Sequence, residues 1–280
     1  MQLTRERFGT VDGADIDLFT LRNDNGLEAQ LTNFGAILTA LKAPDRKGRI
    51  ADITLGHDDL AGWQANDCYM GATVGRYGNR IANGRFELDG TTCQLATNDS
   101  DHHLHGGDVG FNKRVWTAAP FDEGDRVGVG MQYTSPDGEE GYPGTLTAQV
   151  TYALTRDNEL QVRFTAETDR PTIVNLVHHT YWNLSGDPTQ TIGDHVLALH
   201  ADKFLPVDDG AIPTGTVADV AGTPMDFRSP TPVGERIDQV DGGYDHNWIL
   251  RTPEGELTPA AEVTHPGSGR TLSITTDQAG

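Results

Sequence analysis

The sequence has 280 residues, of which 36% are hydrophobic, and its 41 acidic residues outnumber 21 basic ones to give a net charge of −20. This length can bury a sizeable core in one large all-β domain, and the 33 glycines and 14 prolines indicate many turns. The charge argues against nucleic-acid binding, since phosphates would be repelled. No apolar run reaches the roughly 20 residues of a membrane-spanning helix, so we expect no membrane association.

The start of the chain, "MQLTRERFGT", has no apolar stretch typical of a secretory signal, so we expect a cytoplasmic protein. Cys68 and Cys93 form neither a disulfide framework nor a zinc knuckle, and we interpret both as small apolar fillers. Carboxylates are spread along the chain, whereas only four lysines occur, at 42, 47, 113 and 203. This balance favours a high-salt cytoplasm, where screening weakens self-repulsion, over an ordinary acidic protein.

Alternating apolar residues predict most of the elements. "DDLAGW" at 58–63 reads as a short helix, and "RFELDGTTCQL" at 85–95 as a hairpin around an Asp-Gly turn. A strand follows at 126–133, and the runs at 146–154 and 159–166 flank "TRDN" as an antiparallel pair. Because there is no linker and no internal repeat, we expect residues 1–280 to form one domain, a large antiparallel β-sandwich or barrel.

Four polar clusters accompany these strands. One cluster, at 75–86, offers guanidinium and amide donors among glycines, and another, "DHHLHGG" at 101–107, holds three histidines. In "LVHHTYWNLSG" at 176–186, two histidines and a tyrosine follow a β run, and "GGYDHNWIL" at 242–250 places a carboxylate after two glycines. Each cluster also has a plain structural interpretation: a solvated turn, a core histidine or a turn-capping aspartate. The candidate residues are Arg76, Asn79, Arg80, His102, His103, His105, His178, His179, Tyr181 and Asp245.

In an extended segment His179 and Tyr181 share one face and His178 lies on the other. A histidine is the natural proton donor near neutral pH. A zinc site on "HHLH" is the weaker hypothesis, because His103 and His105 would oppose His102 and no cysteine completes the set. Imidazoles, a guanidinium, an amide, a carboxylate and aromatic rings together suit a neutral polyhydroxy ligand such as a sugar. The sequence has no phosphate-binding loop motif and no GxSxG nucleophile elbow.

Seven motifs in order make the sequence resemble the aldose 1-epimerase (galactose mutarotase) family. They are "GRYGNRIANGRF", "HLHGG", "SPDGEEGYPG", "NLVHHTYWNLSG", "FLPVDDGAIPTG", "VAGTPMDFR" and "GGYDHNWIL". The resemblance implies a large antiparallel β-supersandwich and the interconversion of α and β anomers of free hexoses such as galactose and glucose. It implies no cofactor and a small-molecule sugar as the partner. We expect no metal, and either a monomer or a homodimer.

The resemblance also assigns residues. The family's acid falls on His179, and His105 would help to bond the ring oxygen or a neighbouring hydroxyl. The sugar contacts fall on Asn79, Arg80, Arg76, Tyr181 and Asp245. His178 stands where the family usually has asparagine.

The family's general base is a glutamate in a C-terminal "G-x-x-x-E-x-Q" motif, and no residue of this sequence matches it. We therefore expect a C-terminally truncated form, with a natural fragment as the alternative. Loss of the base would leave a non-catalytic sugar-binding protein, which is the alternative to an active epimerase.

Overall fold

The computed structural model describes residues 1–253 and 255–280. They form two compact units, of which the first comprises 1–43 and 54–182 and the second comprises 44–53 and 183–280. Antiparallel strands dominate both units, which confirms the all-β prediction, whereas the single domain stays a prediction. Within the described residues, no helix is long and apolar enough to cross a membrane.

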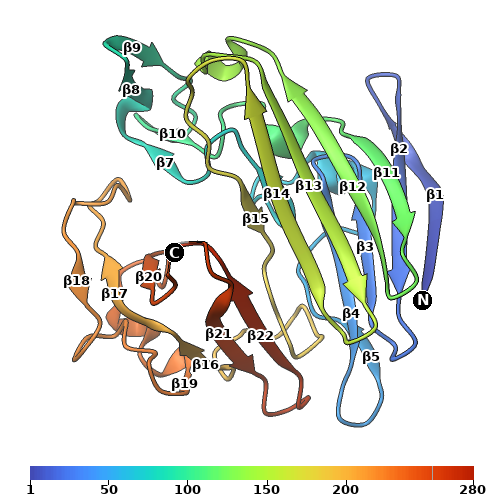
Figure 1. Ribbon diagram of the computed structural model, residues 1–280. Helices are drawn as coiled ribbons and strands as arrows, with labels where there is room; N and C mark the ends of the chain where they lie inside the picture. Colours follow the sequence, from blue (N-terminus) through green and yellow to red (C-terminus); the bar gives the residue numbers. More distant parts are fainter. Residues whose placement is uncertain (254) are drawn as a thin grey trace. The chain divides into compact units, whose positions relative to one another are not determined.

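Two antiparallel sheets form the body of the first unit (Figure 1). One contains, as neighbours, β1 (Gln2–Val11), β2 (Ala14–Arg22), β3 (Glu28–Thr32) and β4 (Ile37–Pro44). The other contains β11 (Thr117–Asp122), β12 (Arg126–Ser135), β13 (Leu146–Thr155) and β14 (Leu160–Thr168). Strands β1 and β2 both contact β12, so the two sheets pack on one another.

The predicted alternation sets which faces are buried. In β13, Leu146, Val150 and Tyr152 are at most 1% exposed, and β12 buries its alternate residues against the same core. The partner strand β14 pairs antiparallel with β13, as predicted, but its apolar face is only partly buried. The hairpin prediction for 146–166 is therefore confirmed, while the burial of its second strand is weaker than the pattern indicates.

Short elements complete the first unit. The predicted helix is α1 (Leu60–Gln64), and the side chain of Asp59 caps it by accepting the N–H of Gly62. The predicted hairpin is β8 (Arg85–Leu88) with β9 (Thr91–Gln94), and both turn residues have positive φ. The other ribbons pair β7 (Arg80–Ile81) with β10 (His103–Leu104) and β6 (Ala72–Val74) with β15 (Val177–His179). The 3₁₀ turns are η1 (Ala82–Gly84), η2 (Phe111–Lys113) and η3 (Glu139–Gly141).

The second unit contains two smaller sheets and β5 (Ile50–Asp52). One sheet has the order β19 (Thr231–Pro232), β16 (Val196–Leu199), β21 (Thr258–Thr264), β22 (Thr271–Thr276). The other has the order β18 (Ala218–Asp219), β17 (Ala201–Leu205), β20 (Asn247–Leu250). Its 3₁₀ turns are η4 (Val233–Glu235) and η5 (Ile237–Gln239). Phe204, Val220 and Met225 form an apolar cluster on which Trp248 packs.

Two buried histidines of the second unit are stacked, with ring centroids 4.8 Å apart. Nε2 of His195 accepts the backbone N–H of Leu184 at 2.9 Å, and Nδ1 of His265 accepts that of Ser268 at 3.1 Å. Each ring therefore carries its proton on the other nitrogen, which faces Asp194 at 3.1 Å for His195 and 3.2 Å for His265. Both imidazoles thus point an N–H at the same carboxylate.

In the first unit, a buried arginine joins its own loop to the connection between β12 and β13. The Arg76 side chain donates to Ser135 Oγ at 2.8 Å, to the Pro136 carbonyl at 3.0 Å and to the Gly144 carbonyl at 2.8 Å. Ser135 Oγ in turn donates to Glu139. The residue is only 2% exposed, and its guanidinium is occupied by these carbonyl and hydroxyl acceptors. The expected sugar contact of Arg76 is therefore wrong, because all the bonds of this side chain are made inside the protein.

Replacing Arg76 tests this structural role. Arg76→Met leaves the Ser135 hydroxyl and the Pro136 and Gly144 carbonyls without their donor, and we expect the free energy of unfolding to fall by about 3 kcal/mol. Urea unfolding measures the change. Arg85→Met is the matched control, because its partner Glu87 and Arg85 itself are both more than half exposed; it should cost at most about 1 kcal/mol. Equal stabilities of the two variants would contradict the assignment.

The histidine stack predicts a loss of stability in mild acid. Burial is the main cause that lowers the pKa of His195 below its usual 6.5. The unfolded chain therefore binds a proton as the pH falls below about 6.5, whereas the native ring resists it. We expect the free energy of unfolding to drop between pH 7 and pH 5 by more in the wild type than in His195→Gln. Parallel pH dependences of the two proteins would contradict this.

Candidate active site

His179 ends β15, where its strand pairs with β6, and the N–H of Gly71 donates to its carbonyl at 2.9 Å. The ring lies 5.2 Å from that of Tyr181 between centroids, which confirms that these two side chains share a face. His178 points elsewhere: its Nδ1 lies 3.2 Å from Tyr152 Oη and its Nε2 2.7 Å from Thr180 Oγ1. Because the backbone is extended, the side chain of His179 faces the site and that of His178 faces the interior.

His105 follows the ribbon of β7 and β10. The backbone N–H of His105 donates to the Asn79 carbonyl at 3.1 Å, and the backbone N–H of Asn79 donates to His105 Nδ1 at 2.9 Å. Because Nδ1 accepts a hydrogen bond, the proton of the neutral ring sits on Nε2. His105 is therefore built as a neutral hydrogen-bond donor.

Close packing fixes the loop after His105. A Cβ at Gly106 would lie 1.8 Å from the Gly75 carbonyl oxygen, so only glycine fits there. The carboxylate of Glu140, from the "SPDGEEGYPG" motif, accepts the N–H groups of Asp108 at 3.0 Å and Val109 at 3.1 Å. These contacts hold the His105 ring in place without using the ring itself.

The rings of His105 and His179 lie next to each other, although the two residues are 74 positions apart in the sequence (179 minus 105). Their ring centroids lie 5.0 Å apart and the rings are nearly perpendicular, at 89°. Burial, followed by the positive charges of His179 and Arg80, lowers the pKa of His105 to about 3. His105 consequently stays neutral across the physiological range.

Arg80 and Asn79 stand beside this pair. Arg80 Nε donates to Asp99 at 2.7 Å, an ion pair whose side chains are 19% and 32% exposed. Asn79 is exposed, and its side-chain oxygen accepts the N–H of Arg80 at 2.8 Å. The structure thus brings Asn79, Arg80 and His105 together, as the sequence motifs predict.

Tyr69 also belongs to this cluster, and the sequence analysis missed it. Its ring lies 4.6 Å from His105 and 5.9 Å from His179 between centroids. It stands in an irregular loop, "DCYMG", which has neither a periodic pattern nor a polar cluster. Only the three-dimensional pairing of β6 with β15 brings it beside the histidines.

Asp245 lies in the second unit. It is exposed and lies in the sequence between Tyr244 and Trp248, two aromatic residues whose side chains are hydrogen-bonded. Tyr244 Oη donates to the Pro224 carbonyl at 3.2 Å, and Trp248 Nε1 donates to the Met225 carbonyl at 3.0 Å. The carboxylate thus stands on a rigid support, and its contact with a sugar stays a prediction.

The three histidines of "HHLH" are each hydrogen-bonded to a different part of the protein. His102 Nδ1 accepts the Asn83 N–H at 3.1 Å, and the buried His103 lies 2.7 Å from the Ala96 carbonyl oxygen and 2.5 Å from Tyr142 Oη. Across residues 1–253 and 255–280, no group of three possible metal ligands includes them. The zinc hypothesis for this motif is therefore wrong.

One such group does occur, made by Asp194, His195 and His265. Both of its imidazoles turn protonated nitrogens toward the carboxylate, because their other nitrogens accept backbone N–H groups. A metal ligand must offer a lone pair, so this donor set does not fit a cation.

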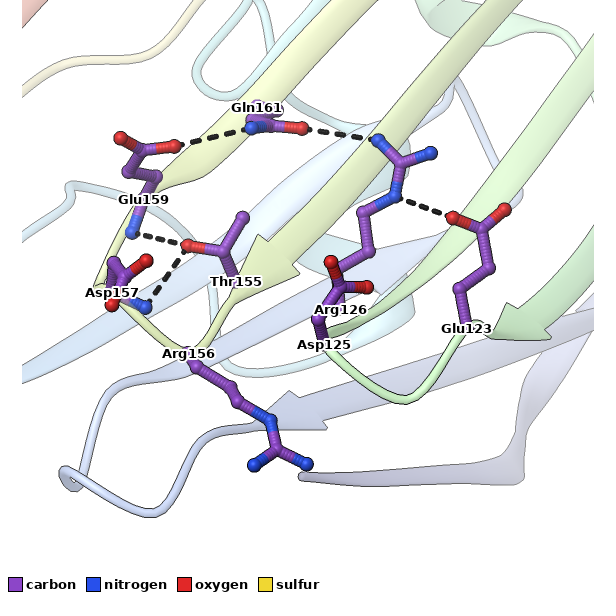
Figure 2. A pocket seen from close by; sticks show the side chains of 8 residues that line it. All are labelled: Glu123, Asp125, Arg126, Thr155, Arg156, Asp157, Glu159 and Gln161. Atoms are coloured by element: carbon purple, nitrogen blue, oxygen red, sulfur yellow. Dashed lines mark hydrogen bonds and ion pairs between the residues drawn. The ribbon is translucent and has the colours of Figure 1, made fainter.

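A hollow of about 430 Å³ lies at the other end of the β11–β14 sheet (Figure 2). Figure 2 shows its side chains bonded to one another, with Arg126 donating to Glu123 at 2.6 Å and to Gln161 at 3.3 Å. Arg126 begins β12 and Ser135, the partner of Arg76, ends it, which puts them roughly 30 Å apart along the strand. This hollow is thus a separate surface feature.

Comparison of the sequence with known proteins shows which family it matches. The family model described as aldose 1-epimerase matches residues 17–280. Galactose mutarotase from Bos taurus is 41% identical over 283 residues, covering 100% of this chain and 81% of the relative. Aldose 1-epimerase from Escherichia coli is 37% identical over 257 residues, covering 90% of this chain and 73% of the relative.

A solved structure of a related protein has a similar fold. The galactose 1-epimerase from Lactobacillus acidophilus has a TM-score of 0.84 at 31% identity, covering 94% of this chain and 77% of that one. The family match spans both histidines of the pair and every other candidate residue described above. The chain therefore belongs to the aldose 1-epimerase family.

Proposed function

We propose that this protein interconverts the α and β anomers of free hexoses, with galactose and glucose as substrates. The perpendicular pair of His105 and His179 carries the proposal, because it places a neutral donor beside a second imidazole that can hold a proton. Relatives named galactose mutarotase and aldose 1-epimerase support the substrate class.

The reaction opens and recloses the sugar ring. His179 acts as the acid that protonates the ring oxygen, while the C1 hydroxyl gives its proton to a carboxylate base, the role that the family assigns to a glutamate. The C5–O side then becomes a hydroxyl and C1 an aldehyde, and rotation about C1–C2 presents the other carbonyl face for reclosure. None of the site residues named above acts as this base.

The neutral state of His105 makes this division of labour possible. Two imidazolium rings with centroids 5.0 Å apart would repel each other, so the pair holds one proton at most near neutral pH. His105 donates Nε2–H to the ring oxygen or an adjacent hydroxyl and accepts nothing there. The developing charge is thereby stabilised by one fixed donor and one proton donor.

The remaining residues bind the sugar hydroxyls. Arg80 uses Nε for Asp99, which leaves its terminal nitrogens as donors, and the exposed Asn79 stands next to it. Tyr181, which is 41% exposed, lines the same face as His179. For Asp245, in the second unit, we propose the role of a carboxylate that accepts from two neighbouring sugar hydroxyls.

Polarimetry with fresh α-D-galactose tests the proposal. The wild type should speed the approach to equilibrium rotation, and His179→Asn should lower kcat by about 10²- to 10⁴-fold because the acid is lost. His102→Asn is the control, since His102 is bonded to the loop backbone and should leave turnover near normal.

Two results would count against the assignment. Near-normal turnover in His179→Asn would show that another group is the acid. Galactose binding without any acceleration by the wild type would make the protein a non-catalytic sugar binder.

We also propose that the protein works at high salt. Four carboxylates, of Glu123, Asp125, Asp157 and Glu159, crowd the turns around the hollow of Figure 2 against two arginines. With a net charge of −20, self-repulsion destabilises the compact state until ions screen it.

The salt proposal predicts a rise in Tm with NaCl, most of it below about 1 M, where the Debye length has shrunk to about 3 Å. Thermal unfolding at 0.05, 0.5 and 2 M NaCl measures it, with a neutral osmolyte as the control for solute exclusion. A Tm that is the same at low and molar salt would contradict the proposal.

A further inference from the structure

Tyr69 contacts both members of the histidine pair. Its ring meets His105 edge to face, with a centroid distance of 4.6 Å and an interplanar angle of 63°. It meets His179 at 5.9 Å, tilted by 38°. A single aromatic side chain therefore limits the freedom of two imidazoles that stand perpendicular to each other.

The loop that carries Tyr69 is closed at both ends. The buried Asn66 side chain donates to the Met70 carbonyl at 3.0 Å and accepts the Met70 N–H at 3.2 Å. The N–H of Gly71 donates to the His179 carbonyl at 2.9 Å. Tyr69 itself has φ = 58°, a left-handed conformation that a bulky residue adopts only when its surroundings impose it. The loop therefore holds the ring in a fixed place relative to His179.

We propose that Tyr69 is a positioning residue for the histidine pair, whose ring holds His105 and His179 in their perpendicular arrangement. The inference rests on the proposed function in the sense that the pair performs the chemistry. Nothing requires Tyr69 to touch the sugar or to exchange a proton.

The ring, rather than the hydroxyl, carries this role. Burial, followed by the charges of Asp99 and Asp67, raises the pKa of the Tyr69 phenol, so the side chain stays neutral near pH 7. The ring also contributes to the desolvation of His105 that keeps this imidazole uncharged. The charged or titratable groups that face His105 are His179, Arg80, Asp99 and His103.

Ring deletion and hydroxyl deletion separate the two possibilities. Tyr69→Asn removes the ring but tolerates the left-handed backbone, whereas Tyr69→Phe removes only the hydroxyl. We expect Tyr69→Asn to lower kcat roughly ten- to a hundredfold with a smaller change in KM, because misplaced catalytic groups lose rate. Tyr69→Phe should keep nearly all activity. Cys68→Ala, an exposed neighbour on the same loop, is the matched control.

A merely structural residue would not move histidine titration. We therefore expect the acidic limb of kcat/KM against pH to shift to higher pH in Tyr69→Asn, because water reaching His105 raises its pKa toward 6.5. NMR titration of the two histidine rings measures the same shift without any assay of activity. Tyr69→Leu is the second ring-deletion variant if Tyr69→Asn has lost its native Tm.

Two results would overturn the inference. One is a histidine titration in the ring-deletion variant identical to that of the wild type. The other is a loss in Tyr69→Phe as large as that of Tyr69→Asn, which would assign the role to the hydroxyl. A wild type without mutarotation would overturn the proposed function instead, and the NMR titration would still decide the positioning role.

Discussion

One hydrogen bond, from the backbone N–H of Asn79 to Nδ1 of His105, decides where the proton of that ring sits. A backbone donor cannot titrate, so the ring nitrogen that accepts it cannot take up a proton without losing the bond. His105 is thereby committed to donating through Nε2. The chemistry of the pair follows from a peptide group that takes no part in the reaction.

The rest of the first unit can be understood as support for that bond. The ribbon of β7 and β10 brings Asn79 and His105 side by side, and Glu140 secures the loop that follows. Arg76, a buried residue in the bend between β6 and β7, ties the same region to the end of β12. The sugar-facing residues thus lie on short loops, while long strands and buried polar groups hold those loops still.

Buried histidines recur in this protein, and the same physics gives them different uses. His103 and His195 are nearly inaccessible, and for both it is mainly burial that lowers the pKa. Each has its ring nitrogens bonded within the protein, so each serves the fold. His105 differs in one respect. Its Nδ1 is bonded to the backbone N–H of Asn79, whereas its Nε2 points away from that partner. Sequence alone does not distinguish these cases, because "HHLH" reads as one cluster although its members face different surroundings.

Much of the fold and half of the site were accessible from sequence for a physical reason. Alternation predicts buried faces, so β13 and the hairpin at Asp89-Gly90 were predictable. The motif order also indicated the histidine pair with Asn79 and Arg80. Arg76 was misassigned because a guanidinium among glycines suits a ligand and a buried carbonyl cluster equally well. Tyr69 was missed because its role depends on the pairing of β6 with β15, which no local pattern encodes.

The left-handed residues around the site set a limit on how this protein can evolve. Tyr69, Asn79, His105 and Glu140 all have positive φ, although none is glycine. Each such residue costs of order 1–3 kcal/mol, which a glycine at the same position would relieve. Glycine would at the same time remove the ring, amide or carboxylate that the site uses. Selection for greater thermal stability and selection for turnover therefore pull these four positions in opposite directions, and stabilising changes are to be sought in the strands instead.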